Sequence, residues 1–298
     1  MPEHVVQRGI LVGVDGSANS DAAVRWAAQE AAMRNVPLTV VHVASPLVGG
    51  WSAWEFAAAP PPEGFVEWQE AEANGVVADA ARVAERSTAD HRPLRISPDV
   101  VFAQVVPTLV DLTKEAQMIV VGRQGQGAFS SALLGSVSNA LVHHAHCPVA
   151  VIHEDTGPAQ SNAPVLVGVD GSTASELATA IAFEEAAFRG VDLVVLHSWS
   201  DHELSDFLGL QWSEMSATAH QTLVERLARW QERYPEITVQ LVVVEDKPAR
   251  NLVERSKSAQ LVVVGSHGRG GFAGMHLGSV STAVVHAVRA PVIVARQG

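Results

Sequence analysis

Short apolar runs alternate with longer segments of helical periodicity along the whole chain. The runs ILVGVD (10–15) and MIVV (118–121) are almost continuously apolar, as strands buried on both faces of a sheet are. The segment DAAVRWAAQEAAMR (21–34) is rich in alanine and has apolar residues at helical spacing. Because strand and helix alternate strictly, the pattern predicts an α/β fold: a doubly wound parallel sheet with helices on both faces.

The pattern predicts five strands in the first half of the chain, with helices between them. Ser17 and Asn19 are candidate N-terminal caps for the first of these helices. We expect strands at 10–15, 38–43, 99–105, 118–122 and 148–153, and helices at 21–34, about 66–90, 108–116 and 130–145.

An internal repeat shows that the second half has the same fold. Residues 10–43 align with 165–198 at an offset of 155, and the glycine-rich stretches at 122–136 and 265–279 align at an offset of 143. The difference places 12 extra residues in the first half, most simply within 49–65. We therefore expect two domains of one fold, residues 1–153 and 165–298, joined by a linker at 154–164 that is rich in Gly, Pro, Ser and Asn.

Composition narrows the functional class. The chain has 298 residues, 47% of them apolar, which suits two hydrophobic cores. Its formal net charge of -12 argues against nucleic acid as a partner, because a duplex binder normally carries a basic patch. A single cysteine excludes an intrachain disulfide, and no apolar run approaches the roughly 20 residues that span a bilayer. We expect a soluble cytoplasmic protein with no membrane partner.

The two glycine-rich stretches are the strongest candidates for a binding site. GRQGQGAFSSALLGS (122–136) and GSHGRGGFAGMHLGS (265–279) each follow a predicted strand, at the edge where doubly wound sheets bind ligands. Glycines there allow positive φ and close approach of backbone amides to a phosphate, and the Gly-Ser pair that follows lies near a helix start, which favours anions. The P-loop pattern is absent, and a dinucleotide fingerprint would belong after the first strand instead. The alternative for each glycine is a tight strand-to-helix turn without a ligand.

The spacing within these stretches resembles a known family. Gly122-x2-Gly125-x9-Gly135-Ser136 recurs as Gly265-x2-Gly268-x9-Gly278-Ser279, and this is the spacing of ATP-binding universal stress proteins. Both GVDGS segments and the ends of the second strands also match, so the whole chain resembles a tandem universal stress protein. The resemblance implies a regulatory protein of the stress response that binds one ATP per domain and controls growth or survival. The alternative is an enzyme that hydrolyses ATP slowly with a divalent metal.

The resemblance also implies which residues hold the nucleotide. Asp15 and Asp170 would face it together with a bound Mg²⁺ or Mn²⁺, and the backbone of Val43 and of Ser198 would contact adenine. Arg269 would reach the phosphates, whereas the first copy has Gln126 there and Arg123 nearby as a substitute. The full set is Gly13, Asp15, Val43, Gly122, Arg123, Gly125, Gly135, Ser136, Val137, Ser138, Gly168, Asp170, Ser198, Gly265, Gly268, Arg269, Gly278, Ser279, Val280 and Ser281.

Partners follow from the same resemblance. Family members commonly pair through the fifth strand, so we expect the two halves to form a pseudo-dimer within the chain; further pairing into a homodimer and the identity of a regulatory protein partner stay open.

Other chemistry-bearing residues have simpler interpretations. The cluster HHAHC (143–147) has zinc-ligand residue types, but histidines also complement the dipole at the end of a helix. His42 and His197 recur at strand ends, where hydrogen-bonded histidines are the simpler interpretation than catalytic bases. The aromatic residues of 49–65 could form a lid, a partner surface or ordinary packing.

Overall fold

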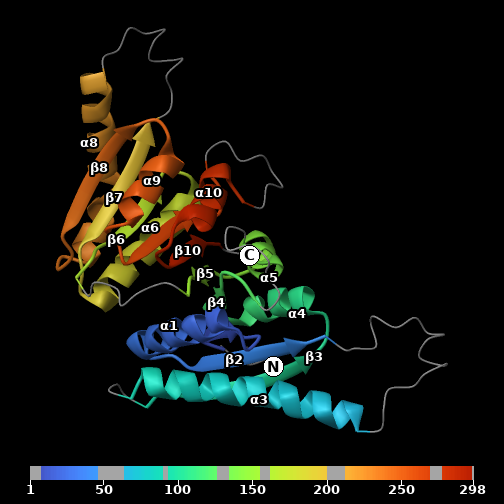
Figure 1. The fold of residues 1–298 in the computed structure, drawn as a ribbon. Coiled ribbons are helices and arrows are strands. Elements are labelled where there is room, and N and C mark those ends of the chain that lie inside the picture. Colours follow the sequence, from blue (N-terminus) through green and yellow to red (C-terminus); the bar gives the residue numbers. More distant parts are fainter. Residues whose placement is uncertain are drawn as a thin grey trace, which may run out of the picture. The chain divides into compact units, whose positions relative to one another are not determined.

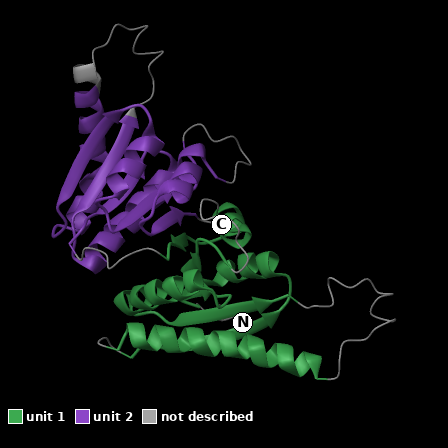
Figure 2. Ribbon diagram, in the orientation of Figure 1, with its two compact units in different colours: residues 1–154, 297–298 green, residues 155–296 purple. Residues whose placement is uncertain are grey.

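The computed structural model describes residues 8–45, 64–89, 93–125, 134–154, 162–199, 212–268 and 277–296. It divides into two compact units, unit 1 within residues 1–154 and unit 2 within residues 155–296 (Figure 2). Each unit is described by itself.

Unit 1 alternates strand and helix from its first described element to its last (Figure 1). Its elements are β1 (Ile10–Gly13), α1 (Ala18–Arg34), β2 (Leu38–Ala44), α3 (Phe65–Ser87), β3 (Ile96–Phe102), α4 (Val105–Leu112), the 3-10 turn η2 (Thr113–Glu115), β4 (Met118–Gly122), α5 (Ser136–His144) and β5 (Val149–Ile152).

The strands of unit 1 form one parallel sheet in the order β3-β2-β1-β4-β5. This order confirms the predicted doubly wound fold. The order reverses between β1 and β4, because the chain runs outward from β1 to β3 and then returns to start β4 on the other side of β1. The three residues Ile10, Leu11 and Val12 are completely buried, as expected of a central strand covered on both faces.

Helices cover both faces of this sheet. α1 packs against α3, and α4 packs against α5 (Figure 1). The Ser17 side chain caps α1 by accepting a hydrogen bond from the backbone N–H of Ser20, so Ser17 is the N-cap and Asn19 lies inside the helix.

Several boundaries differ from those predicted. β3 begins at Ile96 and ends at Phe102, so it lies three residues earlier at each end than the predicted 99–105. α4 correspondingly begins at Val105, and its predicted last turn is the tighter 3-10 turn Thr113–Glu115. α5 begins at Ser136 instead of 130, because Gly135 is its N-cap with extended backbone angles. Pattern alone places such boundaries only to within a few residues.

Unit 2 repeats the same plan, with its strands in the parallel order β10-β9-β6-β7-β8. Here β6, β7, β8, β9 and β10 take the places of β1 to β5 in unit 1. None of the helices in the described part of the chain is long and apolar enough to cross a membrane. The elements are β6 (Val165–Val169), α6 (Thr173–Arg189), β7 (Leu193–Trp199), α8 (Trp212–Arg233), β8 (Val239–Glu245), α9 (Pro248–Ser256), β9 (Leu261–Gly265), α10 (Ser279–Ala287) and β10 (Val292–Ala295).

Candidate functional site

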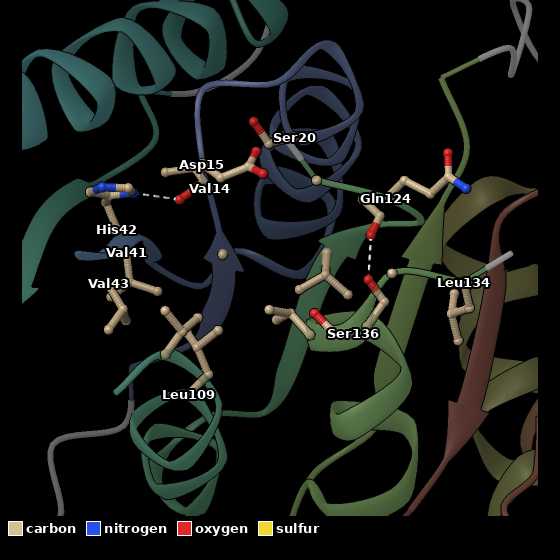
Figure 3. A pocket seen from close by; sticks show the side chains of 18 of the residues that line it. Val14, Asp15, Ser20, Val41, His42, Val43, Leu109, Gln124, Leu134 and Ser136 are labelled. Atoms are coloured by element: carbon tan, nitrogen blue, oxygen red, sulfur yellow. Dashed lines mark hydrogen bonds between the residues drawn. The ribbon is translucent and has the colours of Figure 1, made fainter. Parts of the chain in front are cut away.

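A pocket of about 800 Å³ lies in unit 1 where the strand order reverses (Figure 3). Its walls come from the carboxyl ends of β1, β2 and β4 and from the start of α5. The structure therefore brings together residues separated by more than 120 positions in sequence. Of the residues predicted for this unit, all except Arg123 line the pocket: Gly13, Asp15, Val43, Gly122, Gly125, Gly135, Ser136, Val137 and Ser138.

Asp15 stands directly after β1 and faces the glycine-rich stretch. Its Oδ1 accepts hydrogen bonds from the backbone N–H of Ser17, at 3.0 Å, and from the Ser17 hydroxyl, at 2.6 Å. Its Oδ2 lies so close to Gly125 that a Cβ added there would be 2.3 Å from it. The carboxylate thus has two structural effects. It orders the turn before α1, and it requires a residue without a side chain at position 125.

Positive φ angles occur in the turn after the first strand and not at the predicted glycines. Gly16 and Gly171 have φ of 78° and 82°, which only glycine adopts without strain. Among the described residues of the two stretches, no glycine has a positive φ. The expected positive φ is therefore wrong for the described glycines of these stretches; they allow close approach of neighbouring chain segments instead.

Gly122 illustrates this close approach. A Cβ at Gly122 would lie 2.8 Å from the backbone carbon of Asn19, so α1 begins in contact with the end of β4. The buried Ser138 hydroxyl donates a 2.7 Å hydrogen bond to the Gly122 carbonyl. A Cβ at Gly135 would likewise lie 3.2 Å from the Arg123 carbonyl oxygen. The glycines and Ser138 hold the loop in shape, in addition to lining the pocket.

The start of α5 is the part of the pocket that is chemically suited to an anion. Its N-cap is Gly135, which makes no side-chain hydrogen bond to the first turn. The backbone N–H groups at the beginning of a helix and the helix dipole both favour negative charge. Ser136, Val137 and Ser138 form this first turn and line the pocket, so the predicted phosphate position is chemically suited to an anion.

His42 lies at the opposite side of the pocket from Ser136 (Figure 3). Its Nδ1 is 2.7 Å from the Val14 carbonyl oxygen and must carry the proton of that hydrogen bond, because a carbonyl only accepts. In unit 2, His197 makes the same 2.7 Å contact with the Val169 carbonyl. Both histidines are hydrogen-bonded to the backbone at a strand end, as the simpler interpretation predicted.

Unit 2 repeats the contacts of the site. Asp170 accepts hydrogen bonds from the Ser172 backbone at 2.9 Å and hydroxyl at 2.7 Å, and a Cβ at Gly268 would lie 2.4 Å from its Oδ2. Ser281 donates a 2.6 Å hydrogen bond to the Gly265 carbonyl. Gly278 is the N-cap of α10, whose first turn contains Ser279, Val280 and Ser281.

Two further predicted residues of unit 2 lie on β6 and β7, which pair in the sheet. A Cβ at Gly168, in β6, would lie 3.0 Å from a methyl group of Leu252, so this glycine leaves room for α9. Ser198 lies near the end of β7.

Arg123, the basic residue predicted for phosphate binding in unit 1, does not line the pocket. Arg123 follows β4, where its backbone N–H donates to the Ile152 carbonyl at 2.7 Å, and burial lowers the pKa of its guanidinium. Arg269 and Gln126 lie outside the described residues, as do Trp51, Trp54 and Phe56.

The cluster at 143–147 has structural roles. His143 Nδ1 lies 2.7 Å from the Asn139 carbonyl, within the same helix. The backbone N–H of His146 donates to the Thr113 hydroxyl at 2.9 Å. Cys147 is buried, and burial raises the pKa of its thiol to about 12. Among the residues that the structure describes, no three His, Cys, Asp or Glu side chains group into a metal site.

Sequence patterns did not reveal several residues that line the pocket. Two of them, Val105 and Leu109, lie on α4, the helix that follows β3. The only sequence feature that could have indicated them is the amphipathic spacing of this helix. That spacing shows a buried face without showing what the face covers. The remaining lining residues are Val14, Ser20, Val41, His42, Ser45, Val121, Gln124 and Leu134.

The fold and site define a class: a tandem pair of doubly wound α/β units, each with an Asp–Gly contact at the switch point of its sheet. The model of the Universal stress protein family matches residues 8–153 and again 162–296. The chain belongs to the universal stress protein family, with two of its domains in tandem.

Relatives of similar length support this assignment. A universal stress protein of Mycobacterium tuberculosis is 55% identical over 293 residues, covering 98% of both chains. Another from the same organism is 51% identical over 291 residues, covering 97% of this chain and 96% of its own. The crystal structure of a universal stress protein from Archaeoglobus fulgidus, 20% identical, matches with a TM-score of 0.67 over 98% of this chain and 99% of that one, which shows the shared fold.

Proposed function

We propose that this chain is a regulatory protein of the stress response that binds one adenine nucleotide, ATP, in each unit. Membership of the universal stress protein family supports the role in stress. The observation that carries the nucleotide proposal is the pocket of unit 1, in which an apolar wall and a helix N-terminus meet at the switch point of the sheet. Its volume of about 800 Å³ lies within the usual range for small-molecule sites.

The two ends of the pocket suit the two ends of a nucleotide. Val41 and Val43 from β2 and Leu109 from α4 offer an apolar surface for a base (Figure 3). Ser136 and Val137 begin α5, where backbone N–H groups would bind phosphate oxygens. Asp15 lines the pocket, and its carboxylate fits beside the glycine-rich stretch because position 125 has no side chain.

The same carboxylate would hold a divalent ion carried by the phosphates. Mg²⁺ is typically bound through one or two carboxylates together with phosphate oxygens and water, so Asp15 alone would suffice from the protein in unit 1, and Asp170 in unit 2. The ion would neutralise phosphate charge beside these acidic groups.

We further propose that ATP is retained as a regulatory ligand and is not turned over rapidly. Phosphoryl transfer to water requires a group that orients the water in line with the γ-phosphate. The imidazole of His42 is tied to Val14 and lies on the far side of the pocket from Ser136, where the phosphates would bind (Figure 3). Slow hydrolysis with a divalent metal is the second candidate, and the two differ in measured turnover.

The test is calorimetric titration of ATP into the full chain and into a double variant, Gly125→Ala with Gly268→Ala. Each added methyl group would meet the carboxylate of Asp15 or Asp170 at less than 3 Å, so the carboxylate must leave its position beside the glycine. We expect binding to be lost while the circular dichroism spectrum is retained. Gly75→Ala is the matched control, because a Cβ there meets nothing within 4 Å, and its binding should be unchanged. Unchanged affinity in a folded double variant would exclude these stretches as the site.

A further inference from the structure

Ser198 carries a buried hydroxyl that makes no hydrogen bond within the part of the chain that the structure describes. Such groups are rare in folded proteins, because a buried donor or acceptor without a partner loses its hydrogen bonds to water. Burying a hydroxyl without a partner destabilises the folded state, and natural sequences usually avoid this cost. A buried hydroxyl without a partner therefore needs an explanation. An apolar residue at this position would avoid the penalty.

Unit 1 has valine at the corresponding position. In unit 1, β2 pairs with β3 so that Val43 lies opposite Val101; in unit 2, β7 pairs with β8 so that Ser198 lies opposite Val244. The preceding histidines, His42 and His197, make the same 2.7 Å contact to the neighbouring strand. The two strands therefore end in the same register, and Ser198 occupies the place of Val43.

The place of Val43 is the wall of the pocket where we propose that the base binds. The residues of unit 2 that correspond to the other apolar wall residues are also apolar: Leu196 replaces Val41, and Leu252 replaces Leu109. Both leucines are buried. Ser198 therefore places a hydroxyl where unit 1 has an apolar wall residue, while the other two corresponding positions stay apolar.

We propose that the Ser198 hydroxyl is a specificity-determining group of unit 2, which hydrogen-bonds to the polar edge of a bound nucleotide base. A hydroxyl can donate to a ring nitrogen or accept from an exocyclic amine, so it suits the edge of a base. A site with an unpaired buried polar group discriminates strongly against ligands that leave it unpaired. Unit 1, with Val43, has no such side-chain group, so the two units hold their bases by different contacts. This inference rests on the proposed nucleotide site.

The test exchanges the two residues. Ser198→Val in a Gly125→Ala background, where unit 1 is disabled, should weaken ATP binding to unit 2 by about three- to tenfold, the effect of one neutral hydrogen bond. The same substitution should raise the melting temperature of the nucleotide-free protein, because it removes the orphan hydroxyl. Ser198→Thr, which keeps the hydroxyl, should retain most of the affinity. Val43→Ser is the reciprocal control and should lower the melting temperature of the nucleotide-free protein.

The outcomes separate the inference from the function on which it rests. Absence of ATP binding in the folded Gly125→Ala protein would overturn both for unit 2. Binding that is equal in Ser198→Val and in its Gly125→Ala parent would overturn the inference and leave the nucleotide site intact. Lower affinity together with a lower melting temperature would assign Ser198 a packing role and would also overturn the inference. If Ser198→Val fails to fold, Ser198→Ala provides the same readouts.

Discussion

At the scale of single residues, the site is built from side chains that serve the fold and the pocket at once. Asp15 orders the turn before α1 through Ser17 and also faces the pocket beside Gly125. Ser138 holds the Gly122 carbonyl, and the same contacts recur around Asp170 and Ser281. Because the Asp15 carboxylate has both roles, a test of its role in the pocket must remove its charge and keep its hydrogen bonds to Ser17.

Asp15→Asn makes this separation. The amide oxygen of asparagine can still accept the two hydrogen bonds from Ser17, so the melting temperature should change little. The charge is lost, so ATP affinity should fall more in Mg²⁺ than in chelator, by about tenfold for a charge-assisted contact. Asp170→Asn should do the same in unit 2.

Asp21→Asn is the control for the loss of one negative charge. Asp21 lies in the first turn of α1, the helix that follows Asp15, and it does not line the pocket. Calorimetry with and without Mg²⁺ and thermal melting provide the readouts. A large fall in melting temperature with no metal dependence would show that Asp15 only caps the turn.

At the scale of elements, the two units differ where the third strand passes into the next helix. In unit 2, Asp246 and Lys247 have φ of 50° and 53°, and the side chain of Asn251 donates to both of their carbonyls. Left-handed backbone is unfavourable for residues other than glycine, and Lys247 also precedes Pro248. In unit 1 the corresponding Gln104 has a φ of -69° and is unstrained.

Lys247→Gly should therefore stabilise unit 2 by about 1 kcal/mol, because glycine adopts positive φ without strain. Gln104→Gly is the matched control: it should destabilise unit 1 by about 0.5 kcal/mol, since it only adds freedom to the unfolded chain. Urea unfolding of the two variants measures both effects. A loss of stability in Lys247→Gly would mean that the lysine side chain stabilises this turn by more than its backbone strain costs.

Elements also show what the sequence could predict. Strands such as β1 and β4 were predictable because they are buried on both faces, and their carboxyl ends place Asp15 and Gly122 together in any doubly wound sheet. Leu109 was not predictable as a wall of the pocket, because its position depends on how α4 packs. The orphan hydroxyl of Ser198 was equally invisible, since burial without a partner is a property of the folded surroundings.

At the scale of the whole molecule, the repeat has produced two units with the same strand order and the same Asp–Gly contact. The intrachain pseudo-dimer and the regulatory partner stay predictions. Residues 49–65 keep all three interpretations (a lid, a partner surface or ordinary packing), because 49–63 lie outside the described residues. The differences between units, Ser198 for Val43 and Lys247 for Gln104, lie at the carboxyl edges of the sheets. On the proposed function, both units would bind a nucleotide beside the same Asp–Gly contact, with different contacts to the base.

The central claim, one retained nucleotide in each unit, is tested most directly by native mass spectrometry of the full chain after incubation with ATP and Mg²⁺. We predict two intact ATP molecules per chain, one in either single variant, Gly125→Ala or Gly268→Ala, and none in the double variant. The bound molecules should still be ATP after minutes. A wild-type chain that binds no nucleotide, or several ADP formed per chain each second, would contradict the account.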